Sequence, residues 1–259
     1  MLNADFECRN VVMIKMRMRK KPNLIPRLER CRDLLAEKPE QLRGRWRELL
    51  PGCRGLHLEL GCGKGRFTAE TAAAAPEILL AAVERVPDAM VVAMERCRDA
   101  GLRNVRFLDR DVKDCGEIFA SGEVERIYIN FCDPWPKSRD AKHRLTAPGF
   151  LRLYAALLPP AGEIHFKTDN APLFAWSQAQ LRAEGWELRE VTDDLHAGGP
   201  AGVMTDYEAK FYQQGVPIHR LVAVRTAATL DLGAGAPPRL RDAGLADARC
   251  KQGKEDQEA

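Results

Sequence analysis

The sequence predicts an α/β fold in which a mostly parallel, seven-stranded sheet carries helices on both faces. From residue 55 onward, short apolar runs alternate with stretches of helical periodicity, which is typical of a doubly wound sheet. The first apolar run leads directly into a glycine-rich turn, and acidic residues follow the next runs. Because the carboxyl ends of parallel strands meet at one edge of a sheet, these features predict a ligand site at that edge.

The elements are placed by their periodicity and length. Strands are expected at 56–60, 78–83, 105–108, 126–131, 163–167, 186–191 and 218–224. Helices are expected between most of them, at 66–75, 87–100, 147–158 and 171–184. A further helix is expected at 39–50, because Pro39 fits the first turn of a helix.

The composition divides the chain into three parts. Residues 1–38 are expected to form a basic, partly disordered N-terminal arm, and residues 39–225 a single α/β domain. After about residue 226 the sequence turns to Ala, Gly, Pro and charged residues. Such a sequence buries little apolar surface, so residues 226–259 are expected to be a disordered tail.

The composition also limits the partners and the compartment. None of the eight cysteines forms a C-x-x-C pair, and no Cys/His group has metal-ligand spacing. No apolar run approaches the ~18 residues of a membrane span, and no secretory signal is visible. We therefore expect reduced thiols, no metal, no membrane contact and a cytoplasmic location. A monomer and a homodimer are both compatible with these features.

Basic residues are concentrated in two segments, although the formal net charge is only +3. One segment spans residues 15–32, and the other spans 137–144, directly after a proline-rich turn. A charge run is often only a solvated face. Local basic concentrations in a nearly balanced chain are, however, what a nucleic-acid-binding protein requires.

The glycine-rich turn is the first part of a cofactor site. Gly61, Gly63 and Gly65 separate the first strand from the first helix of the sheet. Glycines there permit positive φ and a close approach of a ligand to the backbone. Glu84 ends the second strand, about 20 residues beyond the last glycine, where a carboxylate can accept both ribose hydroxyls of an adenosine.

Two further acids extend this site. Asp111 follows the third strand at the same edge, although Asp109 and Asp114 are alternatives because strand ends are uncertain. Glu59 lies within the first strand, where a buried carboxylate is costly unless it is paired. The ammonium of an amino acid such as methionine would be a suitable partner for Glu59. Glu84 and Asp111 could instead be turn or helix-entry residues.

The fourth strand ends in the turn Asp133-Pro134-Trp135-Pro136, followed by Lys137. The strand presents Asp133 beside the expected cofactor, and the two prolines stiffen the turn. Trp135 could stack on a nucleobase or simply pack against the protein.

Seven segments together resemble the bacterial tRNA (guanine-N7)-methyltransferases, which modify guanine 46 of the tRNA variable loop. These segments are MRMRKKP (16–22), ELGCGKGRF (59–67), VER (83–85), NVRFLDRD (104–111), NFCDPWPKSRDAKHRL (130–145), FKTDN (166–170) and TDYEAKFYQQGVPIHRL (205–221). They follow the family's order and cover most of residues 16–225. Ser138, Asp140 and Asp206 depart mildly from the family's pattern.

The resemblance implies a Rossmann-like class I methyltransferase fold and S-adenosylmethionine as cofactor. Cofactor binding would then involve the glycines of the turn and four acids, namely Gly61, Gly63, Gly65, Glu59, Glu84, Asp111 and Asp133. It also implies that Asp133 is the catalytic residue. As contacts to the tRNA guanine it implies Lys137, Asp169, Thr205, Tyr207 and Glu208.

Guanine N7 carries a free lone pair, so its methylation requires orientation and dryness more than a general base. Asp133 or Asp169 could accept hydrogen bonds from guanine N1–H and N2–H and stabilise the charge that passes onto the purine. Methylation of an exocyclic amine in nucleic acid or protein is the alternative reaction. A catalytically silent RNA-binding scaffold is the alternative from another functional class.

Overall fold

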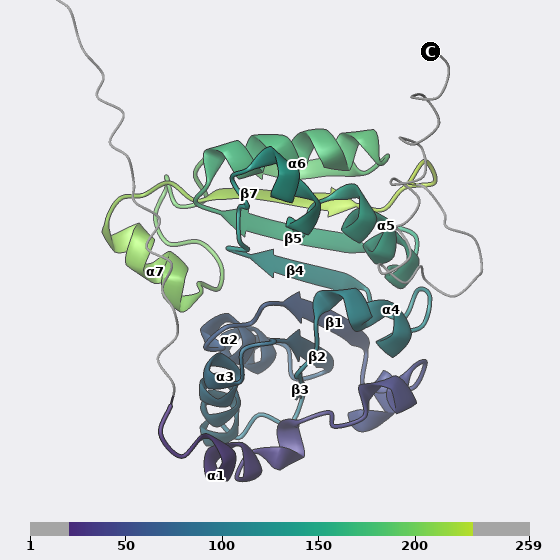
Figure 1. Cartoon of the computed structure of the whole chain (residues 1–259), viewed down its shortest axis with the longest axis vertical. Helices are drawn as coiled ribbons and strands as arrows, with labels where there is room; N and C mark the ends of the chain where they lie inside the picture. Colours follow the sequence, from purple (N-terminus) through teal and green to yellow (C-terminus); the bar gives the residue numbers. More distant parts are fainter. Residues whose placement is uncertain (1–20, 230–259) are drawn as a thin grey trace, which may run out of the picture.

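The computed structural model describes residues 21–229, which are built around one sheet (Figure 1) that has seven strands. The strand order is β3-β2-β1-β4-β5-β7-β6. The pairs within β3, β2, β1, β4 and β5 are parallel, whereas β7 runs antiparallel to both β5 and β6. The mostly parallel, seven-stranded sheet predicted from the sequence is therefore confirmed.

The strands lie within two residues of the predicted positions. They are β1 Gly55–Leu60, β2 Ile78–Val83, β3 Val105–Leu108, β4 Arg126–Asn130, β5 Glu163–Thr168, β6 Glu187–Thr192 and β7 His219–Val224. The first five are buried over most of their length. Strands covered on both faces read as continuous apolar runs, which is why their positions could be located from sequence.

Helices cover both faces of the sheet, as expected. On one face, α2 (Arg66–Ala74) and α3 (Pro87–Asp99) pack with side chains of β2 and β3. On the other face, α4 (Cys115–Ile118), α5 (Pro148–Leu157) and α6 (Ala171–Ala183) enclose the larger core with side chains of β1, β4 and β5. A last helix, α7 (Asp206–Gln213), precedes β7.

The helix expected at 39–50 is wrong. The structure has two short 3-10 helices there, Pro39–Leu42 and Trp46–Leu49, with a further 3-10 turn at Arg32–Leu34 before them. Gly44 interrupts the segment with a φ of 78°, which is outside the helical region. Trp46 is fully buried against Phe119, and its indole N–H donates to the carbonyl of Ile118 at 3.2 Å. Burial of this tryptophan, not helical propensity, determines the path of the segment.

The described part of the N-terminal arm packs against the domain. Helix α1 (Leu24–Glu29) lies along α3, where Arg27 forms an ion pair with Glu95 at 2.5 Å. Further on, Leu35 forms a parallel bridge with Phe107 of β3. At the other end of the chain, the Thr226 and Thr229 hydroxyls donate to the carbonyl of Gly185. The expected disorder in residues 1–20 and 230–259 lies outside the described residues.

Candidate active site

A cavity of 330 Å³ opens at the carboxyl ends of β1, β2 and β4. Four of the acids and glycines selected from the sequence line it, namely Gly61, Glu84, Asp111 and Asp133. Ligands of open α/β sheets bind at this edge. The fold therefore gathers side chains that lie far apart in the sequence into one site.

The glycine-rich turn is held tightly to the end of β2. The N–H groups of Gly61 and Cys62 both donate to the carbonyl of Val83, at 2.8 and 3.1 Å. Gly63 and Gly65 have φ values of 57° and 73°. At Gly65, which begins α2, an added Cβ would lie 2.4 Å from Cβ of Ala93 on α3. Glycine is thus required both by the turn and by the close approach of two helices.

Glu84 both lines the cavity and fastens the turn. Its carboxylate accepts hydrogen bonds from the N–H groups of Gly63 and Val86, each at 2.9 Å. The two bonds fix the carboxylate at the end of β2. A carboxylate fixed beside such a glycine turn is suited to accept ribose hydroxyls.

Glu59 lies deeper, on the sheet face that α2 covers. Its carboxylate is almost fully buried and accepts a hydrogen bond from the Thr68 hydroxyl at 2.6 Å. Burial raises the pKa of Glu59 to about 7, although Thr68, Lys167 and Asn130 oppose this shift. A buried carboxylate in this state favours a cationic ligand group.

Asn130, at the end of β4, lies next to Glu59 and lines the cavity. It lowers the pKa of Glu59, yet neither its side-chain nitrogen nor its oxygen makes a hydrogen bond of normal geometry within the protein. Buried amides are normally satisfied. The amide and the carboxylate together fit the ammonium and carboxylate of a methionine group, so the residues present suit S-adenosylmethionine.

Asp111 lines the cavity, whereas Asp109 and Asp114 do not. The Asp111 carboxylate accepts from the N–H of Lys113 at 3.0 Å and caps a short 3-10 helix, Val112–Asp114. It also lies 3.8 Å from the guanidinium of Arg85. The helix-entry role considered from the sequence and a place in the cavity therefore occur together in this residue.

The turn after β4 is strained at two residues that flank Asp133. Phe131 and Trp135 have φ values of 53° and 42°, a region that bulky residues rarely adopt. Both residues line the cavity with Asp133, which is exposed. Backbone strain of this kind is maintained only where surrounding contacts enforce it.

Arg144 provides such contacts. Its guanidinium donates to the carbonyl of Pro134 at 2.9 Å and to that of Trp135 at 3.0 Å, and it lies 4.4 Å from the ring centre of Trp176. Arg144 belongs to the basic segment 137–144, for which the sequence predicts contact with nucleic acid. In the structure its guanidinium faces the turn, whereas Lys137, Arg139 and Lys142 are exposed.

Tyr207 of α7 lies beside Phe131, which lines the cavity. Its ring centre lies 5.5 Å from that of Phe131, and the side chain remains 47% exposed. Partial burial raises the pKa of Tyr207, and the negative charge of Asp169, directly after β5, adds to this shift. Burial in turn raises the pKa of Asp169 itself. Neither Tyr207 nor Asp169 lines the cavity itself; Tyr207 is connected to it through Phe131.

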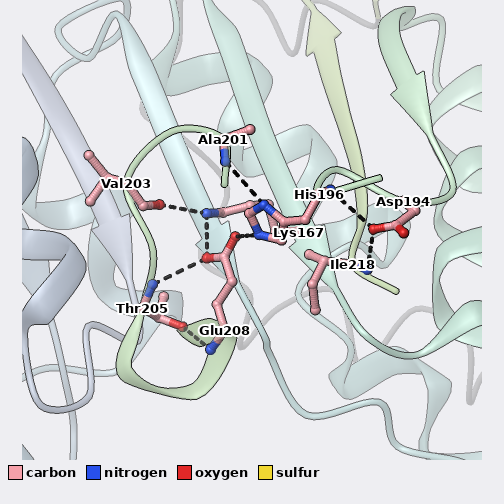
Figure 2. A network of polar contacts seen from close by, with 8 residues as sticks. All are labelled: Lys167, Asp194, His196, Ala201, Val203, Thr205, Glu208 and Ile218. Carbon is pink, nitrogen blue, oxygen red and sulfur yellow. Dashed lines mark hydrogen bonds and ion pairs between the residues drawn. The ribbon is translucent and has the colours of Figure 1, made fainter. Parts of the chain in front are cut away.

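Thr205 and Glu208 take part in contacts within the protein (Figure 2). Thr205 caps α7, its hydroxyl accepting from the Glu208 N–H at 2.9 Å. The Glu208 carboxylate is fully buried and contacts Lys167 at 2.6 Å and His196 at 3.1 Å. It also accepts from the N–H of Thr205 at 3.2 Å. The prediction that Glu208 contacts the guanine base does not fit this arrangement, because its oxygens face protein groups.

Sequence reasoning missed several residues of the site, including Asn130, Lys167, His196 and the inward role of Arg144. Asn130 and Lys167 belong to segments that had been singled out, but at strand ends where a polar side chain has no distinctive period. His196 lies in a loop without any motif. Only their partners reveal what these side chains do.

Within residues 21–229, no group of three or more His, Cys, Asp or Glu side chains is arranged to hold a metal ion. In the same part of the chain, no helix is both long and apolar enough to cross a membrane.

Comparison with solved structures supports the fold. The 16S rRNA methyltransferase KamB superimposes with a TM-score of 0.54 at 16% identity, covering 71% of this chain and 93% of KamB. A 16S rRNA (adenine(1408)-N(1))-methyltransferase mutant from Catenulisporales acidiphilia, solved with the cosubstrate S-adenosylmethionine, gives 0.52 at 15% identity, covering 75% and 94%. At these identities the likeness concerns the Rossmann-like fold alone.

Sequence comparison is more specific. A family model described as "Putative methyltransferase" matches residues 54–221. A tRNA (guanine-N(7)-)-methyltransferase of Listeria welshimeri is 43% identical over 209 residues, covering 80% of this chain and 98% of the relative. Its counterpart from Geobacillus kaustophilus is 43% identical over 211 residues, covering 81% and 97%. The chain therefore belongs to the tRNA (guanine-N(7)-)-methyltransferase family, a family of S-adenosylmethionine-dependent methyltransferases with a Rossmann-like fold.

Proposed function

We propose that this protein transfers a methyl group from S-adenosylmethionine to N7 of guanine 46 in the variable loop of tRNA. The observation that carries the proposal is the position of Asp133. It stands on a strained turn at the mouth of the cavity, with Phe131 and Tyr207 nearby. Relatives 43% identical over nearly their whole length are named for N7 methylation of guanine in tRNA.

The cofactor would lie along the edge of the sheet. Glu84 would accept its ribose hydroxyls, Asp111 would bind further along the same rim, and Glu59 with Asn130 would hold the methionine end. The bound cofactor supplies an electrophilic methyl group on a sulfonium sulfur. The protein supplies position and an electrostatic field that favours the cation.

The guanine would enter beside Asp133. Its N7 lone pair needs no deprotonation, so the task of the protein is to align N7 with the methyl carbon and exclude water. The carboxylates of Asp133 and Asp169 are suited to accept from N1–H and N2–H of the base. They would also stabilise the positive charge that develops on the purine. Tyr207, partly exposed beside Phe131, offers an aromatic surface for stacking.

The exposed cations after the turn would contact the flanking phosphates. Lys137, Arg139 and Lys142 are exposed and close in sequence to Asp133. Phosphate contacts set the register of an RNA without reading its sequence. Selection of the guanine would then rest on the groups at the cavity.

The test is to incubate the purified protein with unmodified tRNA and labelled S-adenosylmethionine and to map the methylated base. Cleavage specific for N7-methylguanosine should give one dominant stop, at position 46. Replacing guanine 46 in the transcript should abolish incorporation. Methylation of an exocyclic amine or of protein, or binding without methyl transfer, would refute the proposal.

The variant Asp133→Asn provides the matched control for this experiment. It should reduce turnover by much more than it reduces tRNA affinity, because the carboxylate acts chiefly in the transition state. Near-normal turnover of Asp133→Asn would show that the catalytic assignment is incorrect.

A further inference from the structure

A row of polar side chains crosses one face of the sheet from the cofactor end to helix α7. Glu59 on β1 and Asn130 on β4 lie near the cavity, and Asn130 pairs in register with Lys167 on β5. The Lys167 ammonium then meets the carboxylate of Glu208 on α7. The row connects the cofactor end of the sheet with helix α7, which packs outside the sheet.

Lys167 is a buried cation with partners inside the protein. Its ammonium donates to Glu208 at 2.6 Å and to the carbonyl of Val203 at 2.9 Å, and it lies 5.2 Å from the ring centre of Phe67. The lysine is 7% exposed and the glutamate 0%. An ion pair so buried adds little net stability compared with apolar side chains, but loss of one partner leaves an uncompensated charge.

Glu208 connects three points of the segment that leads to α7 (Figure 2). One carboxylate oxygen accepts from Lys167 and from the N–H of Thr205, and the other contacts His196 at the start of the segment. The ring of His196 in turn accepts from the N–H of Ala201 at 3.2 Å. Segment 196–208 is therefore tied to Lys167 of β5 at two points, the Glu208 carboxylate and the carbonyl of Val203.

Tyr207 lies near the end of this segment and is partly exposed, whereas the neighbouring Glu208 is buried. The Tyr207 ring contacts Phe131 at the cavity, as described above. Because Tyr207 and Glu208 are adjacent in one helical turn, the anchoring of Glu208 fixes where Tyr207 stands. The buried pair thus sets the position of a side chain at the tRNA-facing surface.

We propose that Lys167 and Glu208 form a buried latch that holds segment 196–208 in place and thereby keeps Tyr207 beside Phe131 of the methyl-transfer cavity. Glu208 is then a positioning residue that acts on tRNA through the latch and does not touch the base. This inference rests on the proposed function and replaces the direct contact with the guanine base that the family resemblance implies for Glu208.

A pair of variants distinguishes a positioning role of Glu208 from a direct contact with the base. Lys167→Met leaves the Glu208 carboxylate buried without its cation, so the segment loosens and tRNA affinity falls, by about tenfold or more. Adding Glu208→Gln removes that charge while keeping an oxygen for the Thr205 N–H. The double variant should therefore bind tRNA more tightly than Lys167→Met alone. If Glu208 contacts the base directly, the added substitution weakens binding further, which overturns the proposal.

A second cycle tests the link to Tyr207. Tyr207→Ala should weaken tRNA binding in the otherwise unchanged protein and have a clearly smaller effect in the Lys167→Met background. If the pair has only a structural role, Tyr207→Ala weakens tRNA binding by the same factor in both backgrounds. That result contradicts the latch. Affinity for S-adenosylmethionine and the thermal transition are measured for every variant, so that unfolding is recognised.

Amide hydrogen exchange supplies a measurement that needs no tRNA. Exchange in segment 196–208 should be faster in Lys167→Met than in the unchanged protein. In the double variant Lys167→Met, Glu208→Gln it should be slower than in Lys167→Met alone. Lys210→Met, which removes an exposed lysine from the same helix, is the matched control and should leave exchange unchanged. Unchanged exchange in Lys167→Met overturns the latch even if guanine methylation is established. Loosened exchange without any tRNA methylation overturns the proposed function and leaves the latch intact.

Discussion

The guanidinium of Arg144 donates a hydrogen bond to the main-chain carbonyl of Trp135, at 3.0 Å, and so holds one of the two strained residues beside Asp133. A second bond to Pro134 and contact with Trp176 fix the guanidinium on its other sides. A planar group with a fork of donors is needed for this geometry, which a lysine cannot reproduce. Arg144 therefore acts inside the protein although it stands in a basic run.

The first prediction follows from this contact. Arg144→Lys and Arg144→Ala should both reduce turnover, by about tenfold or more, because Asp133 is no longer held within the tolerance of an aligned reaction. The salt dependence of tRNA binding should stay the same, since no phosphate contact is lost. Filter-binding titrations at several salt concentrations, together with single-turnover rates, measure both quantities.

Lys142→Ala is the matched comparison for Arg144. It removes an exposed cation from the same segment and should flatten the log–log salt slope by ~0.7–0.9 if it contacts a phosphate. If the slope changes for Arg144→Ala and not for Lys142→Ala, the two assignments are reversed.

The second prediction concerns Glu84. Glu84→Ala should weaken binding of S-adenosylmethionine by about 1–3 kcal/mol, because the ribose loses its acceptor and the N–H of Gly63 loses its partner. Asp109→Ala is the control, since Asp109 is exposed and lies outside the cavity. Calorimetric titration of both variants with S-adenosylmethionine measures the difference. Equal affinities would show that Glu84 does not bind the cofactor.

The third prediction is a pH dependence caused by Glu59. Without cofactor the pKa of Glu59 is raised from 4.5 to about 7 by burial. An ammonium bound beside it favours the charged form, so binding should release a proton below about pH 7. Affinity for S-adenosylmethionine should then rise with pH, by at most about tenfold per unit, and level off above about pH 7.

The same shift acts on stability with the opposite sign. Between 4.5 and about 7 the folded, cofactor-free protein binds more protons at Glu59 than the unfolded chain does, so this group's contribution to stability is lost as pH rises through that window.

Calorimetry in buffers of different ionisation enthalpy counts the protons that are released when S-adenosylmethionine binds. Glu59→Gln should abolish both this proton release and the pH dependence of the affinity. If they persist in that variant, the proton comes from another group.

The fourth prediction compares two glycines of the turn. Gly65→Ala should destabilise the protein by about 2–4 kcal/mol, because the methyl group meets Ala93 and the backbone is left-handed. Gly63→Ala has the same kind of backbone but open space around it, and should cost about 1–2 kcal/mol. Denaturant unfolding of the two variants measures the difference, and equal losses would show that α2 and α3 can separate without cost.

The sequence by itself determined the sheet and most of the cavity. Parallel strands buried on both faces are nearly continuous apolar runs, so β1 to β5 could be placed within two residues. Gly61 and Glu84 directly follow such strands, and Asp111 and Asp133 come three residues after theirs. The rule that ligands bind at the carboxyl edge then brings the four together. These features depend on local pattern and on topology alone.

The tertiary structure decided which charged side chains face inward. Arg144 and Glu208 belong to polar segments and carry no periodicity that marks them as internal, yet one holds the turn at Asp133 and the other meets Lys167 and His196. Likewise, the predicted helix at 39–50 is replaced by two short 3-10 helices because Trp46 is buried against Phe119, which lies far along the chain. Propensity and spacing describe neighbours in sequence, whereas the orientation of a buried charge or ring depends on partners that only the packed fold supplies.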